Sequence, residues 1–174
     1  MGVIRIRVML SHIVWTTYLT FPPQDKRGSW ESMSKVYEEL KRVSEISFVK
    51  PLLMEYNSIP SEERGILSFE DQKVVRDSIV GLAKDKGDRV AGGLGLRAIG
   101  TSETEVHLLI NGTLAESKQK ISRLKSRSAT LLGFSQQKFG DSSKNTWAKG
   151  LWAAEFGNEE IAERVKEFIN AKNV

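Results

Sequence analysis

Apolar and polar residues alternate along the first part of the chain with the two-residue period of a β-strand. The alternation runs from His12 to Phe21, and Pro22 and Pro23 end it because proline cannot donate a hydrogen bond to a strand ladder. Apolar residues then recur at helical spacing from Trp30 to about Ile46. Residues 31–67 as a whole are expected to form a helical insertion or connector of unknown role.

The rest of the chain contains further helical and strand patterns. Helices are expected from Ser68 to Gly87, from Thr113 to Gly133 and from Asn158 onward. The first two begin with capping boxes, in which Asp71 and Glu116 lie three residues after the N-cap. Strands are expected over 89–99, 104–110 and 147–156. Because strands and helices do not alternate strictly, the pattern predicts a single α+β domain over residues 1–174, with an antiparallel sheet covered by helices on one face.

Composition excludes several classes of protein. A chain of 174 residues is the size of one ordinary domain. It contains no cysteine, which excludes disulfide scaffolds, zinc ribbons and thiol catalysis. It has no apolar run of the ~18–20 residues that a membrane span needs, and its N-terminus lacks the pattern of a secretory signal. We therefore expect a soluble, cytoplasmic protein.

The charge is unevenly distributed. The net charge is +4, but residues 118–150 contain eight lysines and arginines against one aspartate, so this window carries +7 and the remainder −3. Such a field attracts polyanions, of which nucleic acid is the usual one. A solvated helix face followed by a loop is the alternative interpretation. The bases predicted to contact DNA lie on the 113–133 helix: Lys118, Lys120, Arg123, Lys125 and Arg127.

Candidate catalytic chemistry is sparse. Gly93, Gly95 and Ala98 match a dinucleotide-binding spacing, but a turn and a strand are expected after them instead of a helix, which disfavours a nucleotide site. His12 and His107 are the only histidines, and His12 is expected to be an ordinary strand residue. Glu105 and His107 lie two residues apart and share one face of their strand, so they can point at a common ion or phosphate. A solvated strand face is the alternative.

The sequence contains three groups of motifs whose order along the chain matches that of a known protein family. They are W-T-T-Y-L-T at 15–20 with D-K-R-G-S-W at 25–30; T-E-V-H-L-L-I at 104–110 with I-S-R-L-K-S-R-S at 121–128; and W-A-K-G-L-W at 147–152 with V-K-E-F-I-N at 165–170. In these stretches, and over roughly residues 12–30 and 68–173, the chain resembles the single-tyrosine HUH transposases of insertion sequences and their repeat-associated relatives.

The resemblance implies a ferredoxin-like domain that forms homodimers by joining sheets and binds single-stranded or hairpin DNA. In the family, two histidines of the strand hold Mg²⁺ or Mn²⁺, and a tyrosine of the last helix attacks the scissile phosphate. Here the first of these positions is Glu105, so the implied metal ligands are Glu105 and His107. The tyrosine position is Phe168, which has no hydroxyl, and a family glutamine falls at Lys172. The tyrosines of the chain, Tyr18, Tyr37 and Tyr56, lie far from the last helix in sequence.

These departures favour a transposase-like DNA-binding protein without strand cleavage. One alternative is a metal-dependent nuclease that uses Glu105 and His107 with water as the nucleophile. Another is an interaction module on the same scaffold that binds no DNA. Trp147 and Trp152 could stack on unpaired bases or belong to the core, and the sequence leaves both interpretations open.

Overall fold

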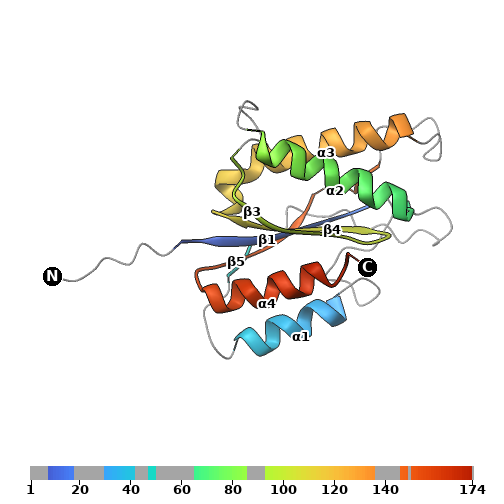
Figure 1. The fold of residues 1–174 in the computed structure, drawn as a ribbon. Helices are drawn as coiled ribbons and strands as arrows, with labels where there is room; N and C mark the ends of the chain where they lie inside the picture. Colours follow the sequence, from blue (N-terminus) through green and yellow to red (C-terminus); the bar gives the residue numbers. More distant parts are fainter. Residues whose placement is uncertain are drawn as a thin grey trace.

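The computed structural model describes residues 8–17, 30–41, 47–49, 65–85, 93–135, 146–148 and 150–173. These residues form four helices and five strands (Figure 1). In chain order they are β1 (Leu10–Thr16), α1 (Trp30–Lys41), β2 (Ser47–Val49), α2 (Phe69–Lys84), β3 (Leu96–Thr101), β4 (Glu105–Asn111), α3 (Leu114–Ser135), β5 (Trp152–Phe156) and α4 (Glu159–Asn170).

The strands form one sheet in the order β2-β5-β1-β4-β3, and each neighbouring pair is antiparallel. The series β1-α2-β3-β4-α3-β5 is the β-α-β-β-α-β order of a ferredoxin-like unit. Helix α1 and strand β2 are inserted after β1, and α4 follows β5. The predicted α+β class and antiparallel sheet are confirmed.

Helices cover both faces of the sheet (Figure 1). Alternate strand residues such as Ile13 and Leu108 pack with Val75 of α2 and Leu124 of α3. The residues between them face the opposite way, where Leu10, Val14 and Leu109 pack with Tyr37 of α1 and Val165 of α4. The prediction of helices on one face is therefore wrong for the whole chain, although it describes α2 and α3. The amphipathic pattern of a helix indicates that one side is buried but not which face of the sheet buries it.

The predicted capping boxes are present. Ser68 Oγ accepts from the Asp71 N–H at 3.2 Å while Asp71 Oδ2 accepts from the Ser68 N–H at 2.9 Å. Thr113 and Glu116 exchange the same pair of bonds at 3.3 and 2.9 Å. The predicted end at Gly133 is wrong, because α3 continues to Ser135. A glycine inside a helix costs only about 1 kcal/mol relative to alanine, and the neighbouring Leu132 is completely buried.

The strand boundaries differ from the prediction in three places. Strand β1 begins at Leu10, and residues 18–21 lie outside the described residues. Strand β3 begins only at Leu96, and residues 89–92 also lie outside them. The predicted 147–156 strand is shorter, because Trp147 makes only an isolated bridge to Thr17 and Gly150 has a φ of +81°. Strand β2 and its pairing to β5 are not predicted by the sequence pattern.

The C-terminal end of α4 closes the outer edge of β3. Asn173 Oδ1 accepts from the Thr101 N–H at 3.2 Å, and its Nδ2 donates to the Ile99 carbonyl at 2.7 Å. Arg76 of α2 donates to Asn173 Oδ1 at 3.2 Å. Helix α4 approaches so closely that a Cβ atom on Gly100 would collide with the Ile169 carbonyl. The backbone groups that β3 would offer to another strand at these positions are therefore bonded to a side chain.

Candidate functional site

A continuous chain of polar side chains crosses the face of the sheet that α1 and α4 cover. His12 Nδ1 lies 2.6 Å from the Tyr37 hydroxyl, and His12 Nε2 lies 3.1 Å from His107 Nδ1. His107 Nε2 lies 3.1 Å from Glu105 Oε2, and Lys172 Nζ lies 3.7 Å from the same oxygen. We call these five residues the polar chain. It joins α1, β1, β4 and the end of α4.

One direction of the hydrogen bonds in the polar chain follows when Glu105 is ionised and both imidazoles are neutral. An ionised Glu105 can only accept, so His107 Nε2 carries a hydrogen and donates to it. His107 Nδ1 is then an acceptor and receives the hydrogen of His12 Nε2. His12 Nδ1 in turn accepts from the Tyr37 hydroxyl. With each imidazole neutral and carrying one hydrogen, every donor in the series points toward Glu105.

Burial favours these neutral forms. The pKa of His12 is held well below 6.5, first by burial and then by the charges of His107 and Lys172. Burial also lowers the pKa of His107, and it outweighs the opposing effect of Glu105. Burial raises the pKa of Tyr37 well above 10, so its hydroxyl keeps its proton at neutral pH. The polar chain thus has neutral groups at its buried members His12, His107 and Tyr37, while Glu105 and Lys172 pair at its outer end.

Phe168 packs against the polar chain at the position that the resemblance assigns to a tyrosine. Its ring meets those of His12 and His107 edge-on, with centroid separations of 6.2 and 5.7 Å. Lys172 Nζ lies 4.9 Å from the centroid of the Phe168 ring. The side chain is partly buried and also packs against the apolar cluster that contains Val165 and Ile169, so it borders the core as well as the histidines.

The structure brings Glu105 and His107 together as the sequence predicts, but inside the protein. The alternative of a solvated strand face is wrong, because Glu105 is 4% exposed and His107 is not exposed at all. Among the residues that the structure describes, no group of three or more His, Cys, Asp or Glu side chains could hold a metal ion. The Glu105 oxygen that faces His107 is also paired with Lys172. The residues present therefore do not fit a divalent cation.

The bases predicted to bind DNA do not share one face of α3. At 100° per residue, Lys120, Arg123 and Arg127 form a stripe along one side of the helix, whereas Lys118 and Lys125 lie on another. Arg123 and Arg127 are exposed and Lys120 is half-buried, with its Nζ 3.5 Å from the Gly93 carbonyl. We call these three residues the basic stripe.

Lys125 is held by the protein itself. Its Nζ donates to the carbonyls of Ala148 and Gly150 at 3.1 and 2.8 Å, and burial lowers its pKa to about 8. The ammonium therefore ties α3 to the segment before β5. We conclude that Lys125 has a structural role that the count of bases along the sequence does not reveal.

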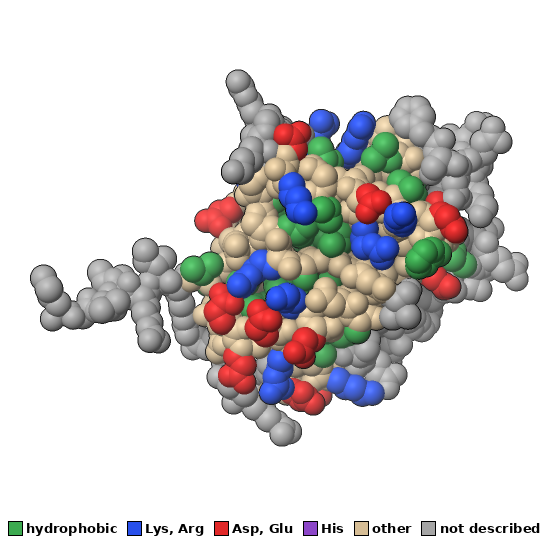
Figure 2. Space-filling model, in the orientation of Figure 1, with side chains coloured by type: hydrophobic (Ala, Val, Ile, Leu, Met, Phe, Trp, Pro, Cys, Tyr) green, Lys and Arg blue, Asp and Glu red, His purple; other side chains and the backbone are tan. Residues whose placement is uncertain are grey.

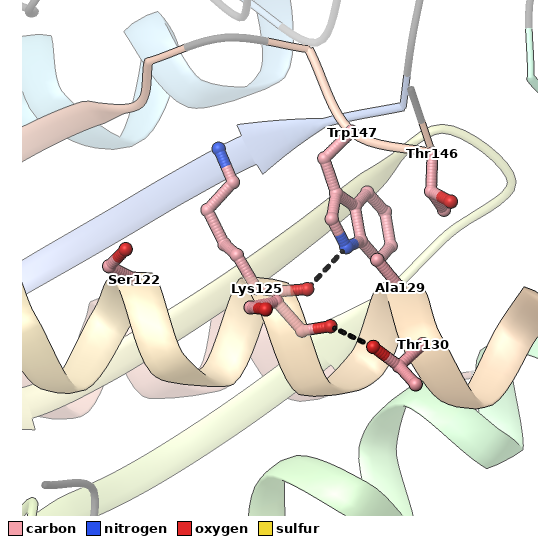
Figure 3. Close-up of a pocket in the computed structure, with 7 residues that line it drawn as sticks. Ser122, Lys125, Ala129, Thr130, Thr146 and Trp147 are labelled. Carbon is pink, nitrogen blue, oxygen red and sulfur yellow. Dashed lines mark hydrogen bonds between the residues drawn. The ribbon is translucent and has the colours of Figure 1, made fainter. Parts of the chain in front are cut away.

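A cavity of about 430 Å³ lies beside Lys125, between α3 and the segment that contains Trp147 (Figure 3). Ser122, Ser126, Ala129 and Thr130 form its helical side. The Trp147 indole donates to the Lys125 carbonyl at 3.0 Å and to Ser128 Oγ at 3.2 Å. Trp147 is 9% exposed and Trp152 is 3% exposed, so both belong to the core.

On the face seen in Figure 2, acidic and basic side chains are interspersed, and no histidine is visible. This agrees with the complete burial of His12 and His107.

Comparisons with known proteins do not identify the chain. No model of a protein family matches it, and no curated protein matches it significantly. No helix among the described residues is long and apolar enough to cross a membrane. The physical arrangement of the residues therefore carries the functional conclusion.

The sequence interpretation misses two members of the polar chain. His12 is predicted to be an ordinary strand residue, yet it connects Tyr37 to His107. The two-residue period of the strand could have revealed the role of His12. It places His12 on the same side of the strand as Leu10 and Val14, which are core residues, and opposite to Ile13. Tyr37 is distant from the last helix in sequence, but α1 packs beside α4 (Figure 1).

Proposed function

We propose that the protein binds single-stranded or hairpin DNA, as the transposases that it resembles do, and that it does not cut the DNA. The observation that carries this proposal is a separation between two regions. The candidate catalytic groups are buried and bonded to one another, whereas the basic stripe lies on α3, on the opposite face of the sheet. Exposed arginines can contact phosphates whether or not the catalytic groups function.

The absence of strand cleavage follows from the groups in the polar chain. Phe168 has no nucleophilic oxygen. Tyr37 is only 2% exposed, its hydroxyl is bonded to His12 and its pKa is raised, so it is unsuited to attack a phosphate. With Lys172 paired to Glu105, no described group is placed to bring a divalent cation to the reaction. The nuclease alternative is disfavoured for the same reason.

We also propose that the protein is cytoplasmic and forms a homodimer. The family joins sheets, and an unpaired edge strand promotes such association. Because Asn173 already occupies the outer backbone groups of Ile99 and Thr101, the dimer would use the β2 edge. Sedimentation at micromolar concentration tests this part of the proposal, and a purely monomeric protein would contradict it.

DNA binding is tested by titration of hairpin, linear single-stranded and duplex DNA at several salt concentrations. If the three bases of the stripe contact single-stranded phosphates, the slope of log K against log salt is about −2, at about −0.7 per contact. Replacement of Arg123 and Arg127 by alanine should weaken binding to all sequences alike and flatten the slope. A matched control replaces Arg164 and Lys166 of α4, which removes the same charge from the other layer.

Two outcomes would change the conclusion. If the control pair weakens binding as much as the stripe pair, the DNA lies elsewhere. If the wild-type protein binds none of the three DNA types at low salt, the alternative of an interaction module that does not bind DNA is favoured.

A further inference from the structure

Lys172 is the only group of the polar chain that reaches solvent to a substantial extent. Its side chain is 17% exposed, whereas that of Glu105 is 5% exposed and that of His107 is fully buried. The ammonium lies 3.7 Å from Glu105 Oε2 and 4.9 Å from the centre of the Phe168 ring. A carboxylate on one side and an aromatic face on the other both favour a cation at this point.

A second observation concerns Thr16, which lies opposite Glu105 in the pairing of β1 with β4. Directly paired residues of an antiparallel sheet place their side chains on the same face, with Cβ atoms about 4.5–5.5 Å apart. Thr16 is fully buried, and its Oγ1 has no hydrogen-bond partner in the described part of the chain. Buried hydroxyls are rarely left unpaired. Glu105, His107 and Thr16 therefore place a carboxylate, an imidazole and an unused hydroxyl on one patch of the sheet.

These three groups are of the types that Mg²⁺ and Mn²⁺ accept, but the charge is already balanced. The Glu105 carboxylate and the Lys172 ammonium sum to zero, and both histidines are neutral. A divalent cation beside Lys172 would be repelled at short range in a poorly solvated site. It would also need a nitrogen of His107 without hydrogen, whereas Nε2 donates its hydrogen to Glu105.

We infer that Lys172 acts as a built-in cation at Glu105 and His107, so that the site excludes divalent metal and becomes a metal site when Lys172 is replaced by a neutral ligand. The buried hydrogen bonds can accommodate this change. Each imidazole has two nitrogens, so the hydrogens of His107 and His12 can shift together toward Tyr37. The Tyr37 oxygen then accepts from His12 Nδ1 instead of donating to it, and His107 Nε2 is left as a ligand. This inference goes beyond the proposed function and does not depend on DNA binding.

The test is a titration with Mn²⁺, in which electron paramagnetic resonance measures the free ion. Lys172→Gln removes the charge and adds an amide oxygen, and we expect it to bind one Mn²⁺ per chain at least tenfold more tightly than the wild type. Lys172→Arg keeps the charge and should behave as the wild type does. The matched control is Lys166→Gln, which removes one charge from α4 at an exposed position. Adding His107→Ala to Lys172→Gln should abolish the new site.

Two outcomes would overturn the inference. The first is that the wild type binds one Mn²⁺ per chain and that His107→Ala abolishes this binding. The second is that a folded Lys172→Gln variant binds no Mn²⁺. If Lys172→Gln does not fold by itself, circular dichroism with and without Mn²⁺ takes the place of the titration. An ion that binds only the folded state should then restore the helical signal, and failure to do so would also overturn the inference. DNA titrations in EDTA are a separate measurement and test the proposed function alone.

Discussion

The two faces of the sheet are stabilised by different interactions. On the side of α2 and α3, the strands contribute apolar side chains such as Ile13, Val106 and Leu108, which pack in one hydrophobic cluster. On the side of α1 and α4, the same strands contribute Val14 and Leu109 but also His12 and His107. Apolar burial stabilises without regard to direction, whereas a buried hydrogen bond requires a partner in a defined geometry.

The difference indicates how each face should respond to substitution. A cavity in the apolar face costs free energy in proportion to its volume, and the surrounding side chains continue to pack against one another. Removal of one member of the polar chain takes a hydrogen-bond partner away from the next buried member, so a second substitution can reduce the loss. Substitutions on the two faces therefore differ in whether a second change can rescue the first.

The largest loss is expected from Leu108→Ala on the apolar face. Leu108 is completely buried, and leucine-to-alanine changes at such sites cost about 2–5 kcal/mol, so we expect about 3–4 kcal/mol. Urea denaturation at pH 7.5 measures it. The matched control is Phe69→Ala, since Phe69 is 60% exposed, and it should change stability by less than about 0.5 kcal/mol. A similar loss from both variants would contradict the description of this face as the main core.

Glu105→Gln should cost about 2–3 kcal/mol, because it leaves Lys172 without its carboxylate in a largely buried site. The contrast with the apolar face appears in the double variant Glu105→Gln with Lys172→Met, which should recover at least about 1 kcal/mol of the loss. A double-mutant cycle by urea denaturation measures the coupling. Strict additivity of the two changes would show that the pair does not interact.

Acidification should destabilise the protein through the α1 and α4 face. Both histidines have pKa values below 6.5 in the folded protein, so below this pH the unfolded chain binds protons that the folded protein does not. Stability is fully present above pH 6.5 and falls as the pH decreases. Between pH 7.5 and 5.5 the loss is about 1.4 kcal/mol for each histidine whose folded pKa lies below 5.5.

His12→Gln isolates the contribution of one ring, because the chain contains only two histidines. We expect the variant to lose roughly half of the pH dependence over this range. The measurement is urea denaturation at half-unit intervals, above the range in which exposed carboxylates titrate. An unchanged pH profile in the variant would mean that His12 is not buried in its neutral form.

The smallest effect is expected from Tyr37→Phe, at about 1–2 kcal/mol. The ring keeps its packing against Trp152, and the hydrogen bond to His12 is lost. Thermal unfolding compares it with Thr130→Ala, in which an exposed side chain loses a bond to the Ser126 carbonyl and the change should be below about 0.5 kcal/mol. Equal shifts for the two variants would place the Tyr37 hydroxyl in contact with water.

Local features of the chain are predictable from the sequence. The capping boxes at Ser68 and Thr113 depend on residues three positions apart, and both form. The shared face of Glu105 and His107 follows from the two-residue period of a strand. Gly133 misleads the prediction because the burial of Leu132, a tertiary effect, outweighs the weak helix propensity of one glycine.

Features that depend on distant pairing are not predictable in this way. His12 and His107 meet because β1 pairs with β4, across a separation of 95 residues. Strand β2 has only three residues and is defined by its pairing to β5. The layer of α1 and α4 buries the sheet face that the sequence alone leaves open to solvent. This layer depends on where α4 packs after β5.

The amide of Asn173 occupies part of the outer edge of β3. A single side chain mimics the peptide group of an incoming strand at Ile99 and Thr101, and Arg76 holds it there. At these two backbone groups, the protection of the edge depends on one residue after α4. Removal of Asn173 would leave the Ile99 carbonyl and the Thr101 N–H open to pairing with a strand of another molecule, so this one side chain opposes edge-to-edge association at β3.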